Sequence, residues 1–244
     1  RHQRHPGLRL HGLLRRAHLR RHRRAGLPGP RGHRPGRGGP GEPRRAALGL
    51  LYAWQAEAIF NEEYAPLLSA FSASELKLLR GMLKNQLNCP MTSSIGRLFD
   101  ALASLLGLCH ISEFEGQAAM ALEACAMQCA VGNTYPTRFI EPILDWQSLL
   151  TGVLADLNKT NPEQIAANIH HTLADWVFAV AEKNHATRLV LSGGCFQNAY
   201  LVDAIVNAEQ AKHYQLFRHA TIPPNDGCLA LGQIYARVLS TVEG

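Results

Sequence analysis

Hydrophobic residues recur with a helical period along much of the chain after residue 43. The first such segment, 44–63, carries Leu48, Leu51, Trp54 and Ile59 on one side, and Glu42-Pro43 supplies a typical helix start. The same spacing predicts three further helices, over residues 74–87, 96–106 and 116–130. Most of the chain's first half is therefore expected to be helical.

The pattern changes after residue 130. Glycines and prolines interrupt short apolar runs over 131–160, which favours loops with one or two strands. Asn161-Pro162-Glu163 then offers an N-cap, a first-turn proline and an early acid, so a long helix to about Lys183 is expected. The last sixty residues alternate as strand 188–191, helix 198–211, strand 214–218 and helix 227–239. This alternation predicts a helix-rich α/β fold with a parallel sheet.

Residues 1–41 differ from the rest in composition. They consist almost wholly of Arg, His, Gly, Pro, Leu and Ala, and this composition cannot form an ordinary hydrophobic core. We therefore divide the chain into an irregular or disordered segment, 1–41, and a folded part, 42–244. A GC-rich gene read out of frame would give such a segment; a basic arm for RNA or membrane phosphates is the alternative.

The net charge of +6 comes from the front of the chain. Residues 1–45 hold fourteen Arg against the single acid Glu42, a net of +13, whereas the remainder holds eleven Lys and Arg against eighteen Asp and Glu, a net of −7. Nucleic-acid binding by the folded part is therefore not expected. No apolar run is long enough to span a membrane, and six scattered cysteines without a C-x-x-C pair favour reduced thiols in the cytoplasm.

The strongest chemical signal is an apolar strand running into SGGCFQN, residues 192–198, which we call the glycine turn. Glycines let a backbone approach a phosphate or ribose closely, and a following helix N-terminus offers N–H groups and a positive dipole end. Gly193 and Gly194 are thus candidate contacts for a phosphate or a ribose. A purely structural Gly-Gly turn is the alternative.

A second signal is Ile222-Pro223-Pro224-Asn225-Asp226-Gly227. Asp226 falls at a predicted helix start, where an acid commonly serves as an N-terminal cap. Its carboxylate can equally bind a divalent cation beside nucleotide phosphates. The local sequence favours the capping role for Asp226, and the cation-binding role is the alternative.

A third signal combines SSIGRLFDA, residues 93–101, with EFEGQAAMALE, residues 113–123. Hydroxyls ahead of Gly96 are expected to cap a helix, Asp100 lies one turn further on, and Glu115-Gly116 opens the next helix. Each of these features is unremarkable alone.

Together SSIGRLFDA, EFEGQAAMALE, SGGCFQN and the later PPNDG segment, in this order along the chain, resemble the C-terminal part of the HypF family of hydrogenase-maturation carbamoyltransferases. Gly41-Glu42-Pro43-Arg44-Arg45-Ala46-Ala47 also resembles that family's REPWR-type helix start. The resemblance covers about 200 of the 244 residues. It implies an actin-like, acetate-kinase-type nucleotide-binding lobe, shared with threonylcarbamoyladenosine synthases and O-carbamoyltransferases.

The resemblance also implies an activity. In the family, carbamoyl phosphate and ATP give carbamoyl-adenylate, and the carbamoyl group passes to the C-terminal cysteine of HypE. By the matched motifs, Asp100 and Gly116 would contact ribose or base, together with Glu115. In the glycine turn, Ser192, Gly193, Gly194 and Asn198 would hold the nucleotide, and Asp226 would bind the metal. No catalytic residue is assigned.

Departures from the family pattern narrow these expectations. The family's upstream histidine pair and Asp-Gly phosphate loop have no recognisable counterpart, so a metal should bind weakly or not at all. Cys195 is expected to be a packed thiol, and a role as the catalytic nucleophile is the minor alternative. Another carbamoyl or threonylcarbamoyl transferase, or a noncatalytic HypE-docking fragment, remains the alternative function.

Overall fold

The computed structural model describes residues 8–9, 41–90, 92–129, 131–140 and 143–242. The predicted irregular segment 1–41 therefore lies almost wholly outside the described residues. From it the structure describes strand β1, Leu8–Arg9, which pairs in parallel with a strand near the C-terminus, and Gly41, which bridges to Ser112. The division at residue 41 stays a prediction.

The first predicted helix, 44–63, is shorter than expected. Helix α2 covers Pro43–Gln55, and two 3₁₀ helices follow, η1 over Ala56–Phe60 and η2 over Glu62–Leu68. Ala56 has a positive φ of 50°, which breaks the α-helical path. The apolar spacing continues through Ile59 because the 3₁₀ segment still faces a buried cluster, so periodicity alone did not reveal the break.

The next three predicted helices are confirmed with shifted ends. They are α3, Ala73–Asn85, α4, Ile95–Leu105, and α5, Gln117–Ala126. Helix α3 begins earlier than the predicted residue 74 because Ser72 and Glu75 form a capping box, in which each side chain binds the other's backbone N–H. The N-cap of helix α5 is Gly116, whose φ of 86° suits glycine.

The segment 131–160 contains an unpredicted helix. The expected short strands are present as β2, Phe139–Ile140, and β3, Ile143–Leu144, which pair antiparallel, but α6 then covers Trp146–Asp156. Asp145 caps this helix by accepting a hydrogen bond from Gln147 N at 3.0 Å. Gly152 favoured a loop in the sequence, but it lies inside the helix. Glycine is required there because a side chain would clash with the ring of Tyr135.

Gly152→Ala is accordingly expected to destabilise the fold although alanine is the better helix former. A Cβ at this position would lie 2.3 Å from Cδ1 of Tyr135, which overpacks the contact. The free energy of unfolding, measured by urea denaturation, should fall by about 1–3 kcal/mol. Gly81→Ala in α3, where no atom lies within 4 Å, is the control and should be neutral or stabilising. Equal stability of the two variants would contradict the expectation.

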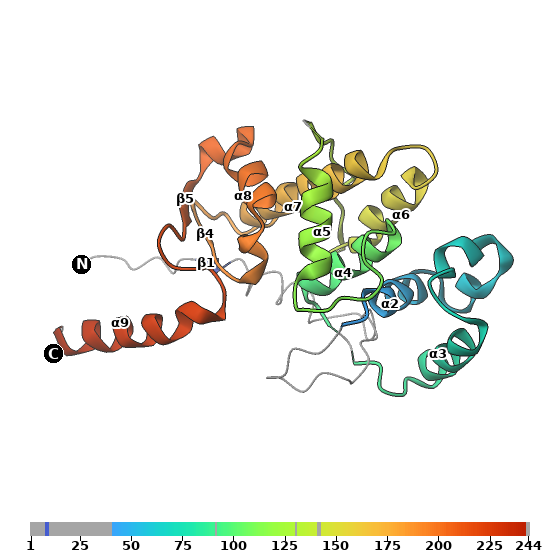
Figure 1. Cartoon of the computed structure of the whole chain (residues 1–244). Coiled ribbons are helices and arrows are strands. Elements are labelled where there is room, and N and C mark those ends of the chain that lie inside the picture. The colour runs from blue at the N-terminus through green and yellow to red at the C-terminus, as the bar shows by residue number, and fades with distance from the viewer. Residues whose placement is uncertain (1–7, 10–40, 91, 130, 141–142, 243–244) are drawn as a thin grey trace.

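The C-terminal third forms the predicted parallel α/β layer (Figure 1). Its long helix α7, Pro162–Lys183, is followed by β4, Arg188–Leu191, α8, Ala199–Val206, β5, Gln215–Arg218, and α9, Leu229–Val242. The strand order is β1-β4-β5, with Leu189 opposite Leu216. The predicted helix 198–211 ends early, at Val206, and the 3₁₀ helix η4, Glu209–His213, leads into β5.

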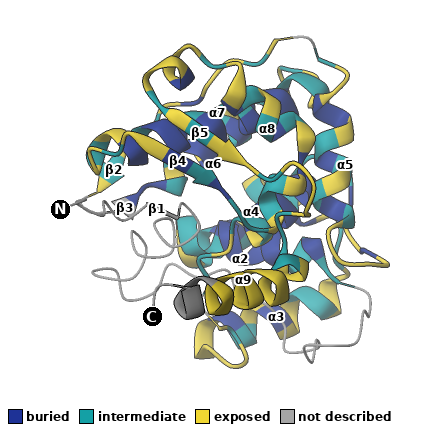
Figure 2. Ribbon diagram, turned by 90° about the vertical axis from the view of Figure 1, so that its left-hand side faces the viewer, coloured by how far each residue is buried: buried dark blue, intermediate teal, exposed yellow. Residues whose placement is uncertain are grey.

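Helix α7 forms the centre of the larger core (Figure 2). It packs against α5, α6 and α8, while α4 joins α2 to α5. Within the core, α7 buries not only aliphatic side chains but also His170 and Thr172, both 0% exposed. Helices that lie far apart in the sequence thus meet around α7.

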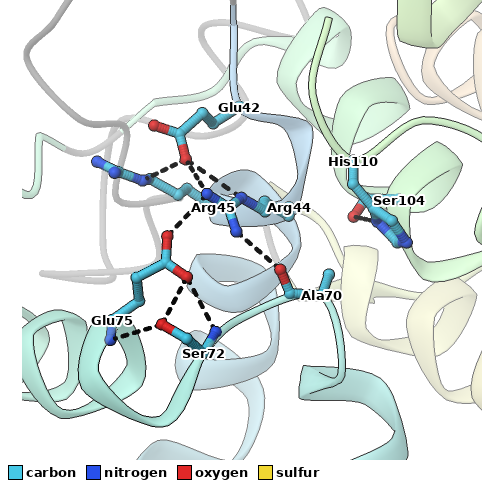
Figure 3. Close-up of polar contacts among 8 residues, drawn as sticks. All are labelled: Glu42, Arg44, Arg45, Ala70, Ser72, Glu75, Ser104 and His110. Carbon is cyan, nitrogen blue, oxygen red and sulfur yellow. Dashed lines mark hydrogen bonds and ion pairs between the residues drawn. The ribbon is translucent and has the colours of Figure 1, made fainter.

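An ionic cluster fastens the start of α2 to the start of α3 (Figure 3). Arg44 pairs with Glu42 at 3.0 Å and with Glu75 at 2.9 Å, and it also donates a hydrogen bond to Ala70 O. Hydrogen bonds from Ser72 and the Arg44 guanidinium hold the pKa of the Glu75 carboxyl down at about 2. The segment that resembles the REPWR motif therefore serves, in this structure, to anchor two helices.

Helix α9 extends away from the body of the described fold (Figure 1). Its contacts are mainly with η5, Asp226–Cys228, the short 3₁₀ helix just before it. Several of its apolar side chains are exposed: Leu229, Leu231, Ile234, Tyr235 and Val238. None of the helices in the described ranges is long and apolar enough to cross a membrane.

Candidate functional site

The glycine turn begins where β4 ends and has a conformation that requires glycine. Gly193 has φ 114° and ψ 158°, a region that side chains other than hydrogen rarely allow. Its amide donates a hydrogen bond to Pro224 O at 2.6 Å. Because Pro224 lies two residues before Asp226, this bond brings the first and second predicted motifs into direct backbone contact.

Gly194 opens the short 3₁₀ helix η3, Gly194–Gln197, and lies at the surface of the turn. An added Cβ would meet only the Gln197 side chain, at 3.9 Å. The amide of Gly194 has no acceptor elsewhere in the part of the chain that the structure describes. Ser192, just before the two glycines, faces His219 Nε2 at 3.4 Å. The turn thus presents an unpaired N–H beside open space.

Asp226 is not a helix cap, contrary to the preference from local sequence. The cap of η5 is Asn225, whose Oδ1 accepts a hydrogen bond from Gly227 N at 3.0 Å. Asp226 is exposed, and no described residue forms a hydrogen bond or ion pair with its carboxylate. The capping alternative is wrong because the preceding asparagine already occupies that position.

The described residues around Asp226 do not supply enough ligands to hold a metal ion. Among the described residues there is no group of three or more His, Cys, Asp or Glu placed to hold a metal ion. A protein-bound divalent cation generally needs several such ligands. The metal role of Asp226 therefore stays a prediction, and no chemical step is derived from it.

The N-terminus of α8 is not free, which corrects the expectation that it offers its amides to a phosphate. Asn198 Oδ1 accepts from Leu201 N at 2.7 Å. Glu123, which projects from α5, accepts from Ala199 N at 2.6 Å and from Tyr200 N at 3.3 Å. Three amides of the first turn are thus satisfied within the protein, and the negative charge of Glu123 already complements the helix dipole.

Asn198 is buried, with an exposed fraction of 7%, and both ends of its amide are used. Besides capping α8, it donates from Nδ2 to Nε2 of His170 at 2.9 Å. The side chain therefore holds the turn in place in this structure. A direct contact of Asn198 with a nucleotide stays a prediction.

The residues of the third motif lie on α4 and just before α5. Asp100 is buried and pairs with Arg97 at 2.9 Å. Burial raises the pKa of the Asp100 carboxyl, Arg97 opposes this shift, and the nearby charge of Glu115 adds to it. Glu115 is exposed, and next to it Gly116 has no atom within 4 Å of an added Cβ. A buried acid, an exposed acid and an open glycine thus lie together.

The first turn of α4 links the third motif to the glycine turn. The 3₁₀ helix η3, which carries Cys195, packs on α4, and the backbone of Gly96 lies near enough to the Cys195 thiol to oppose the rise in its pKa. Ser94 occupies the N-cap position without a side-chain cap, so the predicted hydroxyl cap of α4 is absent. Burial raises the pKa of Cys195, which fits a packed thiol. No hydrogen bond or ion pair in the described ranges joins Asp226 to Asp100 or Glu115.

Two residues at this site, Glu123 and His170, were not found from the sequence. Glu123 lies within a helical pattern where an acid is ordinary, and its partners on α8 are 76 and 77 residues away. His170 lies on a long amphipathic helix and gives no local signal. Only the packing of α5 and α7 against α8 reveals their roles.

Asp100→Asn is expected to lower ATP affinity without lowering the free energy of unfolding at pH 7. Because the folded-state pKa of Asp100 is raised, this carboxyl favours folding below its unfolded pKa, and that contribution is lost as pH rises through the folded pKa. At pH 7 the variant should therefore be at least as stable as the parent, with the difference shrinking towards pH 4. If Asp100 contacts a ribose hydroxyl, ATP affinity should fall by about tenfold.

Urea unfolding at both pH values and calorimetric ATP titration measure the two effects of Asp100→Asn. Arg97→Gln serves as the control. It removes the ion-pair partner of Asp100, so the free energy of unfolding should fall at pH 7, where the buried carboxylate is left without its counter-charge. A large loss of stability at pH 7 in Asp100→Asn would mean that the ion pair outweighs burial.

A family model described as "Carbamoyltransferase, Kae1-like Domain, second subdomain" matches residues 18–233. The match starts inside the Arg-rich segment that composition alone separated from the fold. It includes all three motifs and the strand-helix alternation described above.

Several curated relatives are similar over much of the chain. Carbamoyltransferase HypF of Synechocystis sp. is 36% identical over 154 residues, covering 61% of this chain and 20% of the relative. Carbamoyltransferase HypF of Rhizobium leguminosarum bv. viciae is 33% identical over 218 residues, covering 86% of this chain and 27% of the relative. The chain thus spans about a fifth to a quarter of the length of these relatives.

Solved structures of HypF share the fold. A full-length HypF in a phosphate- and nucleotide-bound form is 27% identical, with a TM-score of 0.65, and the alignment covers 78% of this chain and 25% of that one. HypF of T. kodakarensis, 22% identical, has a TM-score of 0.69 over 83% of this chain and 28% of that one. The helix-rich α/β arrangement is therefore the one found in these proteins.

Proposed function

The chain belongs to the HypF carbamoyltransferase family, and from this premise we propose that it supplies the nucleotide-binding part of an enzyme that transfers a carbamoyl group. One observation carries the proposal. Gly193 adopts a conformation restricted to glycine, and its amide binds the backbone two residues before Asp226. A glycine-lined backbone therefore contacts the segment that carries the exposed Asp226, at the end of a parallel strand, where α/β proteins commonly bind ligands.

We further propose that this fold is the actin-like, acetate-kinase-type lobe. Its support is the parallel pair β4-β5 with α8 as the crossover helix, followed by the β5-α9 unit. The solved structure titled as phosphate- and nucleotide-bound is similar to this chain over most of its length. A nucleotide in that protein favours a nucleotide here.

Each residue of the site would have a defined task. The unpaired Gly194 amide would donate to a phosphate oxygen, and the space at Gly116 would admit the base or ribose. Asp100 and Glu115 would accept from ribose hydroxyls. Transfer from an acyl-adenylate needs orientation and neutralisation of phosphate charge more than it needs a protein nucleophile. The packed Cys195 is accordingly given no covalent role.

The proposed donor is carbamoyl-adenylate, formed from carbamoyl phosphate and ATP, and the proposed acceptor is the C-terminal cysteine of a HypE-like protein. In this step the thiolate sulfur forms a bond to the carbamoyl carbon, and the bond from that carbon to the AMP oxygen breaks. AMP leaves with the electron pair, and the thiol proton goes to solvent. A divalent cation, if used, would have to draw ligands from the nucleotide besides Asp226.

The test uses the full chain with preformed carbamoyl-adenylate and a HypE-like acceptor. Mass spectrometry should detect one added carbamoyl group on the acceptor, and none on an acceptor whose terminal cysteine is replaced by serine. Calorimetry with ATP and magnesium should show binding. Transfer to tRNA or to a small-molecule hydroxyl instead would assign the chain to a sister activity. Binding of the acceptor without any nucleotide binding would identify a docking fragment.

A further inference from the structure

His170 is buried in α7 directly below the glycine turn and has no part in the function proposed above. Its ring is fully enclosed, and Phe99 and Tyr200 flank it with ring centroids 5.4 Å and 5.2 Å away. Phe99 precedes Asp100 on α4, and Tyr200 follows Asn198 on α8. The imidazole therefore lies where the three helices α4, α7 and α8 meet beneath the candidate site.

The hydrogen bonds of His170 define which nitrogen carries the proton. Nδ1 lies 2.7 Å from Ala166 O, a carbonyl that can only accept, so Nδ1 must donate. Nε2 then has a lone pair, and it accepts from Asn198 Nδ2 at 2.9 Å. Burial lowers the pKa of His170 to about 4, so the ring is neutral near pH 7. The neutral Nδ1-H tautomer satisfies both partners.

Asn198 transmits this contact to the glycine turn. With Nδ2 held by His170, Oδ1 is directed at Leu201 N, which sets the start of α8. On the other side, Asn198 N donates to Cys195 O at 3.3 Å and Phe196 N donates to Gly193 O at 3.0 Å. These bonds form a continuous chain from the imidazole, through the peptide group between Cys195 and Phe196, to the carbonyl oxygen of Gly193.

We propose that His170 is a positioning residue: through Asn198 it fixes the glycine turn in the conformation that receives the nucleotide. It does not touch the nucleotide itself. The inference rests on the proposed nucleotide binding for its functional consequence, whereas its structural part can be tested in the free chain.

Two substitutions separate the hydrogen bond from the packing. His170→Phe keeps a ring of similar size against Phe99 and Tyr200 but removes the acceptor, and Asn198 Nδ2 is left buried without a partner. His170→Gln places an amide oxygen near the position of Nε2 and can still accept. His171→Phe is the matched control: this neighbouring ring also packs on Tyr200, at 5.9 Å, and forms no hydrogen bond with a described residue.

The first experiment is amide hydrogen exchange over residues 194–201 in the free chain. Exchange should be about tenfold faster in His170→Phe than in the parent, because this variant loses the hydrogen bond between residue 170 and Asn198. In His170→Gln and His171→Phe, which keep an acceptor for Asn198, exchange should stay near the parent rate. Nitrogen NMR of the parent should show the Nδ1-H tautomer at His170. Unchanged exchange in His170→Phe, or an Nε2-H tautomer, would overturn the positioning role.

The second experiment is calorimetric titration with ATP and magnesium. The dissociation constant should rise about tenfold in His170→Phe, fall back to within about threefold of the parent in His170→Gln, and stay unchanged in His171→Phe. If the parent itself binds no ATP, the proposed function fails while the exchange result still decides the positioning role. If the parent binds and all variants bind equally, the link from His170 to the nucleotide fails alone.

Discussion

Gly193→Ala is expected to abolish most nucleotide binding and to lower the free energy of unfolding by about 1–3 kcal/mol. The φ of 114° and ψ of 158° at this position strain any residue that carries a Cβ. Relief of that strain would rotate the peptide and break the 2.6 Å bond from Gly193 N to Pro224 O. The turn and the Asp226 segment would then separate, and ATP affinity should fall by at least tenfold, as measured by calorimetry.

Gly194→Ala is the matched control for this strain. The two glycines are adjacent, but Gly194 does not have a positive φ, and an added Cβ there meets no atom closer than 3.9 Å. Thermal unfolding of this variant should resemble that of the parent. Gly194→Ala should still weaken ATP binding if a phosphate lies beside the turn. Equal unfolding temperatures for Gly193→Ala and Gly194→Ala would contradict the conformational argument.

Phe99→Ala should cost about 3–5 kcal/mol of unfolding free energy, the largest loss expected for any single side chain considered. Phe99 is 2% exposed and packs in the core where α4 meets α7. Its removal leaves a cavity against the His170 ring, whose centroid lies 5.4 Å away. Asp100 and the helix that carries it would lose their support, so ATP binding should weaken together with stability.

Phe114→Ala is the control for Phe99→Ala. Phe114 lies just before α5 with 49% of its surface exposed, so truncation should cost less than about 1 kcal/mol. Urea denaturation of both variants at one temperature measures the difference. A loss in Phe99→Ala no greater than that in Phe114→Ala would show that α4 is not held by this ring.

Elements with strong local signals were predicted correctly from the sequence. The capping residues Asn161 and Pro162 gave the start of α7, and the apolar run 188–191 gave β4 with its parallel partner β5. These predictions depended on residues that determine their own conformation. The candidate site was partly predictable for the same reason, since Gly193 and the Pro-Asn-Asp segment each define a turn.

The failures occurred where tertiary contacts decide the structure. Helix α6 was missed because Gly152 is explained only by the ring of Tyr135, which packs on it from another segment. The α8 N-terminus was expected to be open, but Glu123 on α5 fills it, and no local pattern connects residues 76 positions apart. The Asp226 cap was misassigned by one residue because Asn225 and Asp226 have similar capping propensities.

The bond from Glu123 to the start of α8 has a consequence for the order of folding. Closing a contact over 76 residues carries an entropic penalty that local turns do not. Until α5 has docked, α8 has no acid at its first turn, and the glycine turn before it is not held from that side. We therefore expect a folding chain to form its helices first and to fix the glycine turn late, after residues on both sides of α7 have met.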